Sequence, residues 1–252
     1  AGTQPILGTQ INLLNDNHLG KITLYATSEK GYKNLTRLSS LSYLKKRDTH
    51  EPSCDVNDLI ENNEDLILLT GSYNDFFGKL FYANKTKIIE KIITKLNPVF
   101  NERMYVEIQR HGEEQEKNYE QYLFALSSLY NLPLIASQEV FYLEPDMAEA
   151  HDALICIGEK QFVDDQNRFR YNNQHYFKSS DEIKKLYKDI PEALTNNYNF
   201  PLRFSFKPKK SKPILPSISN NKKILAKDEL MEQAKKGLAT RINDFISKKI
   251  KK

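Results

Sequence analysis

The residues of this sequence that could do chemistry are a few carboxylates and imidazoles that stand close to short apolar runs. Glu107 lies in the run MYVEI and His111 follows it, whereas Glu139 comes directly after LPLIASQ. Carboxylate oxygens and imidazole nitrogens are the groups that bind divalent cations, so these three side chains are the candidate metal ligands. A catalytic metal centre needs several such groups in one place, and this set is small. We therefore favour a structural, hydrogen-bonded role for His111.

Glu139 is the carboxylate with apolar residues directly after it, namely Val140 and Phe141. Burial among apolar groups raises the pKa of a carboxyl group, which is one way to make a general base. The sequence shows no second ligand or partner for it, so we assign Glu139 no catalytic role.

The other histidines give weaker signals. His18, His50 and His175 lie in polar, turn-like stretches, where surface positions are expected. His151 falls inside the segment DMAEAHDALICIG, which has helical character, so packing explains this residue better than catalysis.

Several site motifs are missing. The sequence has no GxGxxG, P-loop, GxSxG or HExxH pattern, which argues against nucleotide-binding and zinc-protease functions. Cys54 and Cys156 are far apart and form no CxxC pair, so neither a disulfide framework nor a zinc knuckle is predicted.

The elements that must position these residues alternate between strand-like and helical patterns. Short runs rich in Val, Ile, Leu and Tyr recur between longer segments of helical period, which is the pattern of repeated βα units. Chemistry in such folds gathers where the carboxyl ends of the strands meet the loops. The candidate strands cover residues 5–13, 21–26, 66–70, 104–108 and 133–136.

Helices are predicted where apolar residues share one face. Ser179 and Glu182 have the spacing of a capping box, and Pro191 suits the first turn of a further helix. The apolar faces consist of Ile88, Ile89, Ile92, Ile93 and Leu96 in one helix and of Tyr119, Tyr122, Leu123, Leu126, Leu129 and Tyr130 in the next.

Composition indicates a polar-surfaced globular protein outside the membrane. The hydrophobic fraction is 39% and the charged fraction 28%. No run approaches the ~18 apolar residues of a membrane helix, and the start AGTQPILGTQ does not resemble a signal peptide, so we expect a cytoplasmic location. The first residue is alanine within a strand-like run, which suggests a chain cut from a longer one.

The net charge of +4 hides a strong asymmetry. Residues 1–200 carry 22 Lys/Arg and 29 Asp/Glu, whereas residues 201–252 carry 15 and 4. The proline- and lysine-rich stretch after Phe206 reads as an extended linker. We expect a folded domain over 1–206, a linker over 207–222 and a helix over 223–252. The weak candidates for contacts with DNA phosphates are the linker residues Lys207, Lys209, Lys210 and Lys212.

Five blocks of the sequence resemble one family. These are GYKNL at 31–35, LILLTG at 66–71, YVEIQRHG at 105–112, LPLIASQEVFYL at 132–143 and, most closely, the stretch 148–200. In order and spacing they resemble the PHP domain region of bacterial DNA polymerase III alpha subunits. The resemblance covers nearly the whole chain.

This resemblance implies an α/β fold, a PHP-type distorted βα barrel that lacks its first strands and is followed by the basic linker and helix. Intact members hold a cluster of divalent metals at the barrel rim for phosphoesterase chemistry. This sequence has Gln10 where the family has glutamate, Lys21 in place of a histidine, and Glu139 and Phe141 in the motif that reads Asn-Asp-Val-His. The resemblance therefore implies a degenerate site, and we predict no cofactor.

The family resemblance also implies a role in DNA replication. The domain is expected to dock the proofreading exonuclease subunit and to brace the rest of the replicative polymerase, which would contact DNA through other parts. No polymerase active site is expected in this chain. Two alternatives stay open, namely an active metal-dependent phosphoesterase or 3′–5′ exonuclease and a DNA-binding protein that acts through the basic tail.

Overall fold

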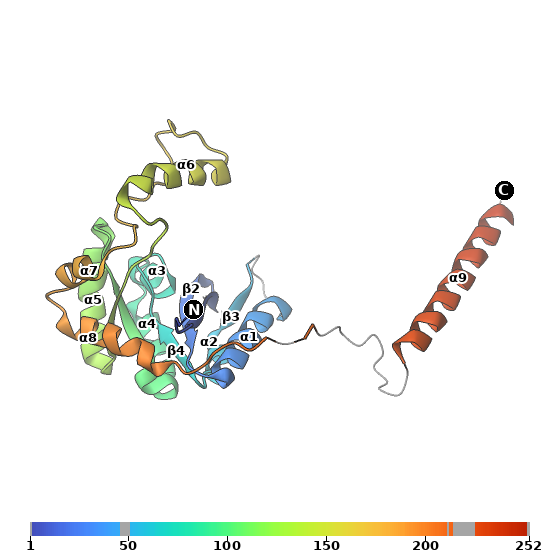
Figure 1. Cartoon of the computed structure of the whole chain (residues 1–252), viewed down its shortest axis with the longest axis horizontal. Coiled ribbons are helices and arrows are strands. Elements are labelled where there is room, and N and C mark those ends of the chain that lie inside the picture. The colour runs from blue at the N-terminus through green and yellow to red at the C-terminus, as the bar shows by residue number, and fades with distance from the viewer. Residues whose placement is uncertain (1, 46–50, 211, 214–224, 251–252) are drawn as a thin grey trace. The chain divides into compact units, whose positions relative to one another are not determined.

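The computed structural model describes residues 2–45, 51–210, 212–213 and 225–250 (Figure 1). The chain divides into two compact units, Ala1–Lys207 and Pro208–Lys252. The second unit contains the helix α9 (Ala226–Ile250). Lys207, Lys209, Lys210 and Lys212 are exposed, and their contact with DNA stays a prediction.

The first unit is an α/β structure, as predicted, built on an open sheet of six strands in the order β3-β1-β2-β4-β5-β6. The strands are β1 (Leu7–Asn15), β2 (His18–Ala26), β3 (Ser53–Asp55), β4 (Leu66–Leu69), β5 (Met104–Gln109) and β6 (Leu134–Ser137). Strands β4, β5 and β6 are parallel and follow the predicted βα alternation.

The first two strands depart from that prediction. β1 and β2 form an antiparallel hairpin with Asn15 opposite His18, and β2 is antiparallel to β4. Asp16 turns the chain with φ at 51°, a left-handed conformation that Asp tolerates better than most residues. Lys21, expected at the start of a strand, lies within β2 opposite Asn12. β3, which we did not predict, pairs in parallel with the end of β1.

Helices cover the sheet, and their buried faces agree with most of the predicted spacing. Ile89, Ile92 and Ile93 of α4 are fully or almost fully buried. In α5, Leu129 is 70% exposed, so its placement on the buried face was wrong. The helices of the first unit are α1 (Glu29–Leu44), α2 (Val56–Glu61), α3 (Phe76–Tyr82), α4 (Thr86–Phe100), α5 (Glu114–Tyr130), α6 (Ala148–Glu159), α7 (Ser180–Leu186) and α8 (Pro191–Asn199), with the short 3-10 helices η1 (Asn101–Arg103), η2 (Pro145–Met147) and η3 (Phe200–Arg203).

The predicted helix starts near the end of this unit are confirmed. Ser179 caps α7 and forms the capping box with Glu182, and Pro191 is the first residue of α8. Helix α8 then packs against β6. None of the described helices is both long and apolar enough to cross a lipid bilayer.

Side-chain amides from α8 complete the outer edge of β6. Asn197 donates from Nδ2 to the carbonyl of Ala136 (2.7 Å) and accepts the Ala136 N–H at Oδ1 (3.0 Å). Asn196 donates to the carbonyl of Leu134 (2.7 Å). An open strand edge is a template for unwanted pairing, and these amides take the place of a neighbouring strand there.

The two ends of the first unit lie side by side. Gln4 Nε2 donates to the carbonyls of Pro201 (3.0 Å) and Phe204 (2.7 Å). Close by in sequence, the N–H of Ser205 bonds to the carbonyl of Thr27 at the end of β2 (3.0 Å). The chain therefore enters and leaves this unit at one place.

Candidate functional site

A polar cleft lies along one face of the sheet, beside strands β1, β2 and β5, and several of the predicted site residues line it. Two cavities, of about 390 and 300 Å³, share Gln10, Asp75 and Glu139 in their walls and so form one cleft. Lys21 lines the smaller cavity, and Glu107 lines the larger one. The structure thus brings together four of the sequence-derived positions, although they come from strands far apart in the chain.

Glu107 is buried at the base of this cleft, on β5, and is only 6% exposed. Its carboxylate accepts the N–H of Gly71 (3.1 Å), the side-chain amide of Gln109 (3.0 Å) and the hydroxyl of Ser137. Burial raises the pKa of Glu107, and these hydrogen bonds oppose that effect. Both carboxylate oxygens are therefore engaged within the protein.

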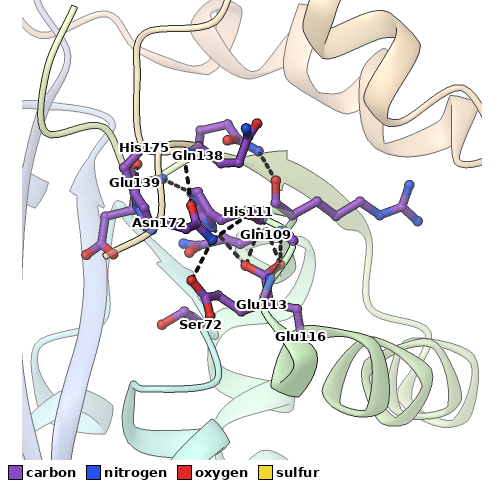
Figure 2. A network of polar contacts seen from close by, with 12 residues as sticks. Ser72, Gln109, His111, Glu113, Glu116, Gln138, Glu139, Asn172 and His175 are labelled. Carbon is purple, nitrogen blue, oxygen red and sulfur yellow. Dashed lines mark hydrogen bonds and ion pairs between the residues drawn. The ribbon is translucent and has the colours of Figure 1, made fainter. Parts of the chain in front are cut away.

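His111 is held by Glu116, the third residue of α5 (Figure 2). Glu116 accepts from His111 Nδ1 (2.8 Å) and from the backbone N–H groups of His111 (2.7 and 2.9 Å), Gly112 (2.9 Å) and Glu113 (3.2 Å). The other ring nitrogen, Nε2, accepts the N–H of Glu139 (3.0 Å). This pattern places the proton on Nδ1, and it engages both nitrogens of His111 in hydrogen bonds.

The Glu139 side chain extends into the cleft, while its backbone is fixed on both sides. Its N–H bonds to His111, and its carbonyl accepts from His175 Nδ1 (3.1 Å) (Figure 2). Partial burial and the nearby Asp75 raise the pKa of Glu139, whereas His111 and Lys21 lower it. The carboxylate is thus more easily protonated than an exposed one.

A stack of aromatic rings adjoins the cleft. His175 is only 4% exposed, so the prediction of a surface histidine there was wrong. Its ring lies 4.1 Å from that of His111, at an angle of 7°. Phe141 stacks on His175 (5.2 Å) and on His151 (4.9 Å), and Tyr171 packs against the same rings. These residues are up to 64 positions apart, which is why their contact is not visible in the sequence.

The other two histidines lie outside this stack. His18 is the first residue of β2, directly after the hairpin turn; it is partly exposed, and its Nε2 faces Lys85 Nζ (3.0 Å). His50 lies outside the described residues.

The buried His175 predicts a pH dependence of stability. Burial and the neighbouring His111 lower its pKa from 6.5 to about 4, with Lys178 acting in the same direction and Glu116 against it. Between pH 6.5 and 4, the His175 imidazole is therefore protonated in the unfolded chain but stays mostly neutral in the folded chain. The free energy of unfolding consequently falls as the pH falls. We expect wild type to lose up to roughly 3 kcal/mol relative to His175→Phe over this window. Urea unfolding of both proteins at pH 7 and pH 4.5 measures the difference, and parallel pH curves would contradict it.

The arrangement of the candidate ligands bears on whether divalent metals could bind in the cleft. Within the described part of the chain, no three His, Cys, Asp or Glu side chains are placed to hold one ion. Of the candidates, Glu107 and His111 have their ligating atoms in internal hydrogen bonds. Gln10 and Lys21 bring a neutral amide and a cation to the cleft, and Phe141 brings an aromatic ring.

Sequence reasoning missed several residues that shape the site. Arg110 forms paired bonds with Glu120 and with Asp189, which tie β5, α5 and the α7–α8 connection together. Asn172 donates to the carbonyl of His111 (2.8 Å) and to Glu113 (2.6 Å). Only the Glu113-x-x-Glu116 spacing could have been found in advance, because it is the spacing of a capping box.

Comparison with known proteins shows similarity to one domain family and to one polymerase subunit. Residues 1–111 match the PHP domain family. The chain is 35% identical over 250 residues to the DNA polymerase III subunit alpha of Caulobacter vibrioides, an alignment that covers 96% of the chain and 22% of the relative. The corresponding subunits of Rickettsia bellii and Escherichia coli K12 are 32% and 30% identical, again over 96% of the chain and 21% of the relative. The chain thus spans about one fifth of the length of these curated relatives.

Proposed function

Because the chain is similar over almost its whole length to the PHP-containing region of DNA polymerase III alpha subunits, we propose that it acts in DNA replication as a structural and subunit-docking module. In this role it needs a folded surface and no metal centre of its own. We place it within a replicative polymerase assembly in the cytoplasm, where its partners would be the proofreading exonuclease subunit and the rest of the polymerase.

The observation that supports a non-catalytic role most directly is that residues at the cleft make hydrogen bonds within the protein. The Glu107 carboxylate and His111 Nε2 accept hydrogen bonds from the protein's own backbone and side chains, so these atoms already stabilise the fold. Lys21 and Lys79 line the smaller cavity, where their ammonium groups offset part of the negative charge of the carboxylates in its walls. The polymerase reaction itself would then depend on parts of the assembly other than this cleft.

Titration with manganese and with zinc tests this proposal. An ion that binds only the folded chain raises its free energy of unfolding by about 2.7 kcal/mol at 100 times its Kd. We expect no such stabilisation in thermal unfolding, no binding heat in calorimetry, and no manganese-dependent cleavage of a 3′-labelled oligonucleotide. Saturable binding together with cleavage would overturn the proposal in favour of an active metal-dependent phosphoesterase or exonuclease.

A further inference from the structure

Residues 140–177 form an arm between β6 and α7, and α6 lies within it, apart from the helices that cover the sheet (Figure 1). Within the described part of the chain, neither cluster of packed hydrophobic residues contains a member of this arm. Among the arm's own residues, Tyr142, Cys156 and His175 alone are buried. The principal neighbour of α6 is η2, which belongs to the same arm. The arm is therefore attached to the sheet with little apolar packing, the dominant favourable term in folding.

Contacts within the arm hold its two legs together. The N–H of Phe141 bonds to the carbonyl of His175 (2.9 Å), and the N–H of Phe177 bonds to the carbonyl of Tyr142 (2.9 Å). Arg168, in the loop after α6, pairs with a carboxylate of that helix. Because these contacts join the beginning, middle and end of the arm, its parts should move together.

The contacts between the arm and the sheet converge on His111 (Figure 2). The His175 ring stacks on that of His111 at 4.1 Å. Asn172 Nδ2 donates to the carbonyl of His111 (2.8 Å) and to the carboxylate of Glu113 (2.6 Å). Where the arm begins, the N–H of Glu139 donates to His111 Nε2 (3.0 Å). Near its end the arm also bonds to α7 through one tyrosine hydroxyl. We call His111 and Asn172 the latch.

An arm attached in this way has low local stability. Segments with few buried apolar contacts open at a lower free energy than the core of the same protein. The range 140–177 is shorter than the roughly 40 residues below which isolated domains seldom stay folded. Helix α6 has 12 residues and is marginally stable at best in water by itself. Once the latch contacts break, the arm should therefore lose its own structure and expose Cys156.

The base of the arm borders the cleft. Tyr171 lines the smaller cavity together with Glu139, and its ring lies 4.8 Å from that of His175. Undocking of the arm takes Tyr171 out of this wall. The cleft would consequently widen on the side of the arm.

We propose that the arm is a conformational device of the fold, which opens as one unit while the sheet stays folded and which the latch of His111 and Asn172 holds closed. The inference is independent of the replication role proposed above, since it concerns contacts within the chain alone.

The two buried free thiols test the proposal, because Cys156 lies in the arm and Cys54 in the main core cluster. The full chain is labelled with a low concentration of a thiol reagent, at which the rate follows the open population. Dividing each rate by that of the same thiol in the urea-unfolded chain gives this population. We expect the open population at Cys156 to exceed the globally unfolded one, known from urea unfolding followed by circular dichroism, at least about tenfold. Equal populations would show that the arm opens only with the whole fold, which would overturn the inference.

A pair of neighbouring asparagines tests the latch. Asn172→Ala should speed labelling of Cys156 roughly tenfold, because it removes two hydrogen bonds that hold the arm closed. The matched control is Asn173→Ala, at an exposed position whose side chain bonds to Gln174 within the arm, and it should leave the rate unchanged. Neither variant should alter labelling of Cys54. If Cys156 reacts no faster in Asn172→Ala than in Asn173→Ala, the inference is wrong.

Two further variants separate opening of the arm from unfolding of the whole unit. His111→Ala changes no residue of the arm but removes the ring on which His175 stacks, so it should also speed labelling of Cys156 roughly tenfold. Ile89→Val, at a fully buried position in α4, should raise the globally unfolded population several-fold without affecting Cys156. An unchanged rate in His111→Ala, or a faster one in Ile89→Val, would refute the independent opening of the arm.

Discussion

Replacing Glu116 by alanine should destabilise the first unit by about 3–5 kcal/mol, because this buried carboxylate has more internal partners than any other single side chain discussed above. It accepts from the His111 ring and from three consecutive backbone N–H groups, those of His111, Gly112 and Glu113. Its removal leaves these donors without acceptors in a site where the His111 side chain is only 3% exposed. Urea unfolding followed by circular dichroism measures the loss.

Two companion variants make this result interpretable. Glu116→Gln keeps the shape and one acceptor oxygen but brings an amide against the same donors, so an intermediate loss is expected. Glu114→Ala, in the same helical turn but exposed, should change the free energy of unfolding by no more than about 0.5 kcal/mol. Equal effects of Glu116→Ala and Glu114→Ala would show that the buried network contributes nothing to stability.

The second large effect is expected at Asn197, whose amide occupies both hydrogen-bonding groups of Ala136 on β6. Asn197→Ala leaves a backbone donor and acceptor at the strand edge without partners, each worth about 1–3 kcal/mol if water does not reach them. We expect a loss of about 2–4 kcal/mol in urea unfolding. The uncovered edge should also promote association of partly unfolded chains, visible as light scattering near the unfolding transition.

Asn199→Ala is the matched control for this experiment. It removes the same side chain from the same helix at an exposed position, so it should neither lower the unfolding midpoint noticeably nor raise the scattering. If Asn197→Ala behaves like Asn199→Ala, the edge of β6 is not protected by α8 in the way that the hydrogen bonds suggest.

Much of the fold could be predicted from local patterns. The faces of α4 and α5, the capping box at Ser179 and the parallel strands from β4 onward follow from spacing alone. The strand arrangement of residues 5–26 was harder to predict. Alternating apolar residues on either side of a polar turn fit a hairpin as well as the start of a βα unit. β3 has only three residues, too few for a periodic signal.

The site could be predicted only in part, since its contacts join distant segments. His111 and Glu139 follow the ends of β5 and β6, and strand ends converge in a parallel sheet, so their proximity was foreseeable. The hydrogen bonds that each of these side chains makes could not be predicted from the sequence. His175 looked like part of a polar turn in YNNQHYF, and nothing local shows that its ring would lie on His111 across 64 residues.

The hydrogen bonds of Gln4 to Pro201 and Phe204 have a topological consequence. Polypeptide attached before residue 4 and after residue 205 would leave the first unit at neighbouring points. The first unit could therefore be inserted into another protein without moving apart the two segments that it joins. It also follows that a short linker could join these two points and new ends could be opened elsewhere, a rearrangement that folded domains with adjacent termini commonly tolerate.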